Sequence, residues 1–77
     1  MNTSLLLHVL RKRNAKYYDV ILVSDGRLID DRTFRSLEKV GEYLEALESL
    51  GLNDLKWHVY FGDGRALVFL RRDGFRW

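Results

Sequence analysis

The segment 36–52 has the clearest helical period in this chain, and this period constrains the fold more than any other feature. Its apolar residues recur at the three- and four-residue spacing that places side chains on one face of a helix. They are Leu37, Val40, Leu44 and Leu47. Ser36 is suited to cap the amino end, and Gly51 suits the left-handed residue after the carboxyl end, with Leu52 folding back on Leu47. We therefore predict an amphipathic helix over residues 36–52.

The segments on both sides of this helix have the composition of β-strands, because they are rich in aliphatic, β-branched and aromatic residues and are bounded by turn residues. The predicted strands are residues 4–12, 17–24, 27–34, 55–61 and 65–71. Asp25-Gly26 and Gly62-Asp63-Gly64 are typical of tight hairpin turns. The expected fold class is α+β: a four- to five-stranded antiparallel sheet, in the order β-β-(β)-α-β-β, packed on a single α-helix.

Length and composition indicate one small globular domain over residues 1–77, because 47% of the residues are hydrophobic and 31% are charged. The chain has no cysteine, which excludes disulfides and thiolate metal sites. The apolar run Leu5–Leu10 is too short to span a membrane, and the basic residues follow it, the reverse of a signal peptide. We expect a soluble, cytoplasmic protein that does not bind membranes.

Apolar residues occupy both faces of the predicted strands. In the strand 17–24, Tyr18, Val20 and Leu22 alternate with Tyr17, Ile21 and Val23. A single helix cannot cover both faces of such a sheet, and monomers rarely leave a large apolar patch exposed. The uncovered face must therefore be closed by curling of the sheet, by a second copy of the chain or by another protein.

No motif in the chain specifies a catalytic chemistry. His8 and His58 lie in predicted strands among apolar neighbours, where a structural histidine is the usual interpretation. Asp30 and Asp31 are adjacent in a predicted strand and would point to opposite faces, which prevents them from acting as a pair. The sequence therefore predicts a binding protein and not an enzyme, without a metal, a cofactor or an evident small-molecule substrate.

Basic residues gather at two places, before the second predicted strand and after the last one, where aromatic residues are interleaved. The candidate nucleic-acid-binding residues are Arg11, Lys12, Arg13, Lys16, Arg71, Arg72, Phe75, Arg76 and Trp77. Cations that contact phosphates and aromatic rings that stack on bases favour a nucleic-acid-associated function. If the two clusters meet, they form one positive end of the sheet. Solvated loop charges that discourage aggregation are the plainer interpretation.

A protein–protein interaction module is the alternative function that the sequence allows. Such a module would be a homodimer, or a small inhibitor of the kind that phages and mobile elements encode. It would bind its partner through the uncovered sheet face or through the acidic face of the helix. The candidate partner-binding residues on this helix are Glu38, Glu42 and Glu45.

Overall fold

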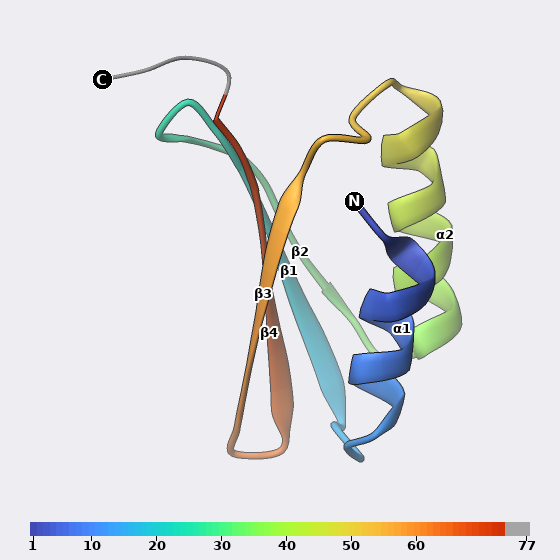
Figure 1. Cartoon of the computed structure of the whole chain (residues 1–77). Coiled ribbons are helices and arrows are strands. Elements are labelled where there is room, and N and C mark those ends of the chain that lie inside the picture. The colour runs from blue at the N-terminus through green and yellow to red at the C-terminus, as the bar shows by residue number, and fades with distance from the viewer. Residues whose placement is uncertain (74–77) are drawn as a thin grey trace.

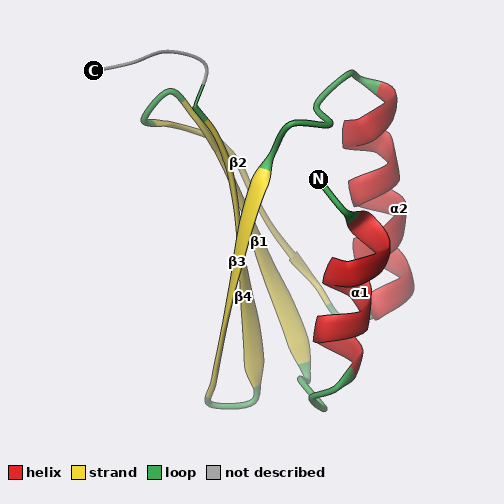
Figure 2. Ribbon diagram, viewed as in Figure 1, coloured by secondary structure: helices red, strands yellow, loops and turns green. Residues whose placement is uncertain are grey.

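The computed structural model describes residues 1–73 and has the element order α-β-β-α-β-β. The elements are α1 (Thr3–Arg11), β1 (Tyr17–Ser24), β2 (Arg27–Phe34), α2 (Leu37–Ser49), β3 (Lys56–Gly62) and β4 (Arg65–Arg72). Figure 1 and Figure 2 show two layers, with both helices on one side of a twisted sheet. In the described part of the chain, neither helix is long and apolar enough to cross a membrane.

The sheet is mixed, with strand order β2-β1-β4-β3, which corrects the prediction of a wholly antiparallel sheet. Two antiparallel hairpins, β1–β2 and β3–β4, form its halves, and the central strands β1 and β4 pair in parallel. Both hairpins turn at an Asp-Gly pair with positive φ at each residue, as the turn signals predicted. The parallel contact arises because the chain crosses over through α2 between the hairpins, which no local turn signal specifies.

The segment predicted as a strand at 4–12 is the helix α1, so the sheet packs on two helices and not on one. Asn2 caps this helix, and its side-chain oxygen accepts a hydrogen bond of 3.0 Å from the Leu5 amide. Leu6 and Leu10, one helical turn apart, are fully buried, while Leu5 is 48% exposed. A short apolar run has no decisive period, so its residue pattern fits a strand and a buried helix equally well.

The second helix, α2, has the caps that the sequence predicted. The Ser36 hydroxyl accepts a hydrogen bond of 3.2 Å from the Lys39 amide. At the other end, Gly51 has φ +86°, and the Leu52 amide donates to the Leu47 carbonyl at 3.0 Å, which is the bond of a Schellman motif. These caps end the helix cleanly before the chain enters β3.

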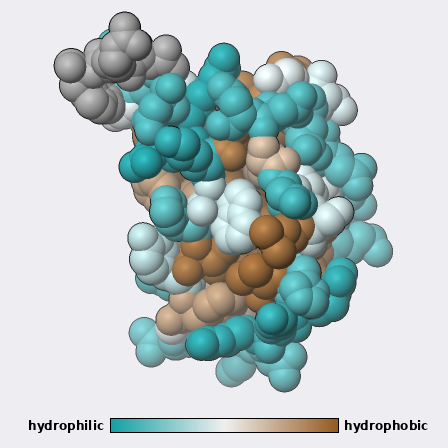
Figure 3. Space-filling view, in the orientation of Figure 1, coloured by the Kyte–Doolittle hydropathy of each residue, from teal (hydrophilic) through white to brown (hydrophobic). Residues whose placement is uncertain are grey.

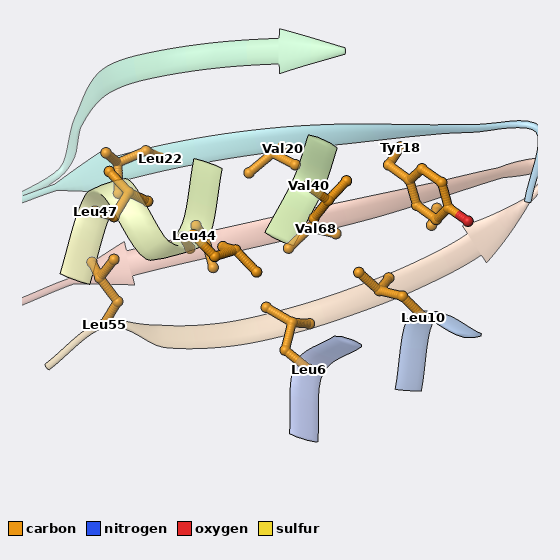
Figure 4. Packing of buried hydrophobic residues seen from close by; sticks show 12 residues of the cluster. Leu6, Leu10, Tyr18, Val20, Leu22, Val40, Leu44, Leu47, Leu55 and Val68 are labelled. Carbon is orange, nitrogen blue, oxygen red and sulfur yellow. The ribbon is translucent and has the colours of Figure 1, made fainter. Parts of the chain in front are cut away.

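One hydrophobic core lies between the helices and the sheet. Because both helices bury their apolar residues in this core, they cover the same face of the sheet. Figure 4 shows side chains from both helices and from two strands that point into the same layer. Its fully buried members include Leu6 and Leu10 of α1, Leu44 of α2, Val20 of β1 and Val68 of β4. The alternating residues of each strand therefore point to the opposite side of the sheet, where the described residues place no helix.

Candidate nucleic-acid interface

The sheet face turned away from the helices is uncovered, and we call it the open face. Residues paired directly across neighbouring strands share a face, so the strand register defines its rows. One row is Thr33, Asp19, Leu67 and Tyr60. The next row is Asp31, Ile21, Phe69 and His58. Leu28, Val23, Arg71 and Lys56 form a third row, and Tyr17 and Arg65 extend the face toward the β3–β4 turn.

Aromatic side chains run across the open face. Tyr60 is 60% exposed, His58 is also exposed, and Tyr17 and Phe69 are half-buried between their neighbours. The apolar residues between them, Ile21 among others, are half-buried as well. The face thus carries rings and aliphatic groups, as the sequence predicted, but charged side chains lie among them, including Asp31, Lys56 and Arg65.

A polar contact in the first row holds one end of the open face together. The carboxylate of Asp19 accepts a hydrogen bond of 2.7 Å from the Thr33 hydroxyl and pairs with the Arg65 guanidinium at 3.3 Å. The Asp19 side chain is 17% exposed, and the Arg65 side chain is 49% exposed. Arg65 is therefore positioned by the sheet but keeps half of its surface available to solvent.

The α1–β1 loop, which carries Lys12, Arg13 and Lys16 of the first predicted basic cluster, lies beside Arg65. We call these four residues the cationic end; Arg11, the last residue of α1, lines the groove between the helices instead. The Lys16 amide donates a hydrogen bond of 2.6 Å to the Gly64 carbonyl, which ties the α1–β1 loop to the β3–β4 turn. The Arg13 guanidinium lies 4.9 Å from the centre of the Phe61 ring. Arg13 and Lys16 are exposed, and Arg13 and Arg65 line the same hollow of about 280 Å³ beside the turn.

The second basic cluster lies at the opposite end of the sheet, so the described residues do not form a single positive end. The Arg72 carbonyl accepts a hydrogen bond from the Asp25 amide in the β1–β2 turn. Acidic groups also neutralise this end, because Arg71 pairs with Asp73 at 3.2 Å and Arg72 with Asp54 at 3.6 Å. The three other candidates of this cluster lie outside the described residues. They are Phe75, Arg76 and Trp77.

The acidic face of α2 lies on the helix side of the molecule, away from the open face. Glu38, Glu42 and Glu45 are exposed and line a shallow groove between the helices, together with Arg11. Glu42 also pairs with Lys39 at 3.5 Å. The role of these glutamates in binding a protein partner stays a prediction.

A second polar cluster connects α2 to β2 on the helix side. The Tyr43 hydroxyl donates a hydrogen bond of 2.8 Å to the Asp30 carboxylate, and Arg32 pairs with the same oxygen at 2.8 Å. The Tyr43 hydrogen bond holds the pKa of Asp30 below its ordinary value, with further help from the Asp31 amide and Arg32. Burial, and then the bond to Asp30, raises the pKa of Tyr43. These contacts anchor the edge strand to the helix.

The variant Tyr43→Phe is expected to have a lower free energy of unfolding than the unsubstituted protein at neutral pH. Its free energy of unfolding should also decrease less as the pH is lowered. Because the pKa of Asp30 is lower in the folded state, the unfolded state takes up this proton first as the pH falls. The stability that the ionised Asp30 contributes is fully present above the pKa of an aspartate in the unfolded chain, about 3.9. This stability is lost as the pH falls through the lower pKa of Asp30 in the folded protein. Urea unfolding of both proteins from pH 7 to pH 2 tests this: their difference should shrink in acid. A difference that stays constant with pH would contradict the assignment.

The two histidines do not have the surroundings that the sequence suggested. Both are exposed, His8 on α1 and His58 on β3. Among residues 1–73, no group of three or more histidine or acidic side chains is placed to hold a metal ion.

Sequence reasoning missed the aromatic and cationic residues that the open face brings together, namely Tyr17, Tyr60, Arg65 and Phe69. The alternation of residues along each strand was the available signal, since it groups residues by face. It does not say which strands are neighbours, and the parallel β1–β4 pair is what joins Tyr17 to Arg65.

No known protein family, curated protein or solved structure matches this chain.

Proposed function

We propose that this chain is a non-enzymatic module that binds single-stranded nucleic acid across the open face. The observation that carries the proposal is an uncovered sheet face that has the exposed ring of Tyr60 and the half-buried rings of Tyr17 and Phe69, and that ends at a group of cations. The phosphates are contacted by the cationic end, and the bases lie along the rings of the third and fourth strands, β3 and β4.

The rings support base binding because a base stacked on an aromatic side chain contributes about 1–3 kcal/mol, whatever its identity. Tyr60 projects from the middle of β3 and is 60% exposed, so its ring is accessible without rearrangement of the core. Phe69 lies one row away on the adjacent strand, β4. These two rings provide neighbouring platforms for successive bases.

The charge distribution favours the same face. Arg13 and Lys16 are exposed, and none of the ion pairs among residues 1–73 includes either of them. The acidic face of α2 lies on the other side of the sheet, where it does not repel a strand bound to the open face. A net charge of only +2 is then compatible with nucleic-acid binding, because the cationic end is a local group of positive charges, separate from the acidic face of α2.

Within residues 1–73, the absence of a helix from the open face favours single strands over duplexes. Reading of a duplex groove needs a protruding helix or ribbon, and the bases of a duplex are stacked on one another. On the open face, the helices are turned away and cannot enter a groove. Unpaired bases, in contrast, are free to stack on Tyr60 and Phe69.

Fluorescence anisotropy with a labelled single-stranded oligonucleotide of about 12 residues tests the proposal. With about four phosphates contacted, the affinity should fall roughly 50-fold between about 50 and 200 mM salt. A duplex of the same length should bind more weakly than the single strand. Absence of binding at low salt up to about 100 µM protein, or binding insensitive to salt, would remove the nucleic-acid function.

A further inference from the structure

The two edges of the sheet differ in how they are protected against pairing with another strand. The outer strand β2 has an irregular register, with a shift at Leu22/Val23 that leaves Ile29 without a partner. It carries Asp30 and Asp31, and the Asp31 amide donates to the Asp30 carboxylate at 3.0 Å. Bulges, charges and occupied backbone groups are the features by which natural sheets prevent edge-to-edge association. The β2 edge is therefore protected.

The other edge strand, β3, has fewer of these features, because it has no bulge and its one charged residue, Lys56, lies at its first position. Its sequence KWHVYFG contains no acidic residue and no proline, and it pairs with β4 over seven residues without a register shift. In Figure 1 it lies nearest the viewer, at the front of the sheet, and Figure 3 shows a hydrophobic patch across the middle of this side. A mainly apolar edge without a bulge is a template for a further strand.

The register shows which backbone groups of β3 are available. The two-residue turn Asp63-Gly64, with φ of 52° and 77°, makes Gly62 and Arg65 a hydrogen-bonded pair. Hydrogen-bonded and non-hydrogen-bonded pairs alternate along an antiparallel ladder. Every second residue of β3 therefore has backbone N–H and C=O groups that point away from β4. These residues are Trp57, Val59 and Phe61. Among residues 1–73, no backbone hydrogen bond from outside the strand reaches these groups.

We propose that the β3 edge is the interface between two copies of this chain, paired antiparallel about a two-fold axis at Val59. In this register Trp57 faces Phe61 of the second copy, and His58 faces Tyr60 of the second copy. Lys56 faces Gly62, so no like charges are opposed, and every side-chain pair of the central five positions is apolar or aromatic.

The backbone supports the same register. The three residues with outward-pointing groups become the hydrogen-bonded pairs of the new ladder, which gives about six additional backbone hydrogen bonds. Two four-stranded sheets then form one continuous sheet. A two-fold axis through such a pair is perpendicular to the sheet, so all the helices stay on one side and the two open faces become continuous.

Charge variants at two exposed positions test the interface by mass in solution. Light scattering and sedimentation equilibrium of the full chain, without nucleic acid, should give twice the 9.1 kDa chain mass at micromolar concentration. His58→Glu with Tyr60→Glu places like charges opposite each other and should give the single-chain mass; His58→Lys with Tyr60→Lys should do the same. A mixture of the two variants should regain the doubled mass, and so should His58→Lys with Tyr60→Glu alone. A single-chain mass for the unsubstituted protein, or a doubled mass for the acidic variant, would overturn the proposal.

A disulfide cross-link tests the register itself, because the chain contains no cysteine. Val59→Cys places the two sulfurs on either side of the two-fold axis, at a Cα separation of about 5.5 Å in a hydrogen-bonded pair. Tyr60→Cys is more exposed, but its Cα would lie about 8 Å from that of the second copy, beyond the reach of a disulfide. Under mild oxidation Val59→Cys should cross-link and Tyr60→Cys should not. Equal cross-linking of both, or cross-linking of Tyr60→Cys alone, would refute this register.

Discussion

Replacing Leu6 by alanine is expected to lower the free energy of unfolding by about 3 kcal/mol. Leu6 is fully buried in the core between α1 and the sheet, so truncation removes apolar contacts and leaves a cavity. A domain of this size has a total stability at the lower end of the usual range, about 5 kcal/mol. About 2 kcal/mol would then remain, so a few per cent of the variant molecules should be unfolded at 25 °C.

The neighbouring variant Leu5→Ala is the matched control. Leu5 belongs to the same helix but is 48% exposed, so its truncation should cost less than about 1 kcal/mol. Urea denaturation followed by circular dichroism measures both variants under the same conditions. If residues 4–12 were a strand, Leu5, Leu7 and Val9 would share one face. A larger loss for Leu5→Ala than for Leu6→Ala would then contradict the helix α1.

The parts of the fold that are predictable from the sequence are those with strong local signals. Helix α2 has a clear period between a serine cap and Gly51, and each hairpin has an Asp-Gly turn. The helix α1 has only nine residues, and its leucines do not alternate with enough polar positions to show a helical period. The cap at Asn2 was the local feature that distinguishes a helix there from a strand.

The candidate site was less predictable because it depends on which strands are neighbours. Arg13 and Lys16 were identified from their charge, and the structure places them beside Arg65, which follows them by about fifty positions in the chain. In the sequence, Arg71 and Arg72 looked equivalent to Arg13 and Lys16 as cations. In the structure, each of the two arginines is paired with an aspartate. Pairing between distant segments is decided by packing of the whole sheet, and a single sequence does not record it.

Loss of the Tyr60 ring is expected to weaken single-stranded oligonucleotide binding by about tenfold, the lower part of the range for loss of one stacked base. The side chain is 60% exposed and is not part of the core cluster, so Tyr60→Ala should leave the fold intact. Tyr60→Phe keeps the ring and should bind like the unsubstituted protein. The salt dependence of Tyr60→Ala should also be unchanged, because the ring does not contact a phosphate.

Leu50→Ala is the control for loss of an exposed apolar side chain elsewhere. Leu50 is 76% exposed and follows α2, on the helix side of the sheet. Anisotropy titrations of one labelled oligonucleotide with Tyr60→Ala, Tyr60→Phe and Leu50→Ala, at one low salt concentration, therefore test the open face directly. We predict weaker binding by Tyr60→Ala alone. Equal affinity of Tyr60→Ala and the unsubstituted protein, or an equal loss in Leu50→Ala, would contradict base stacking on this face.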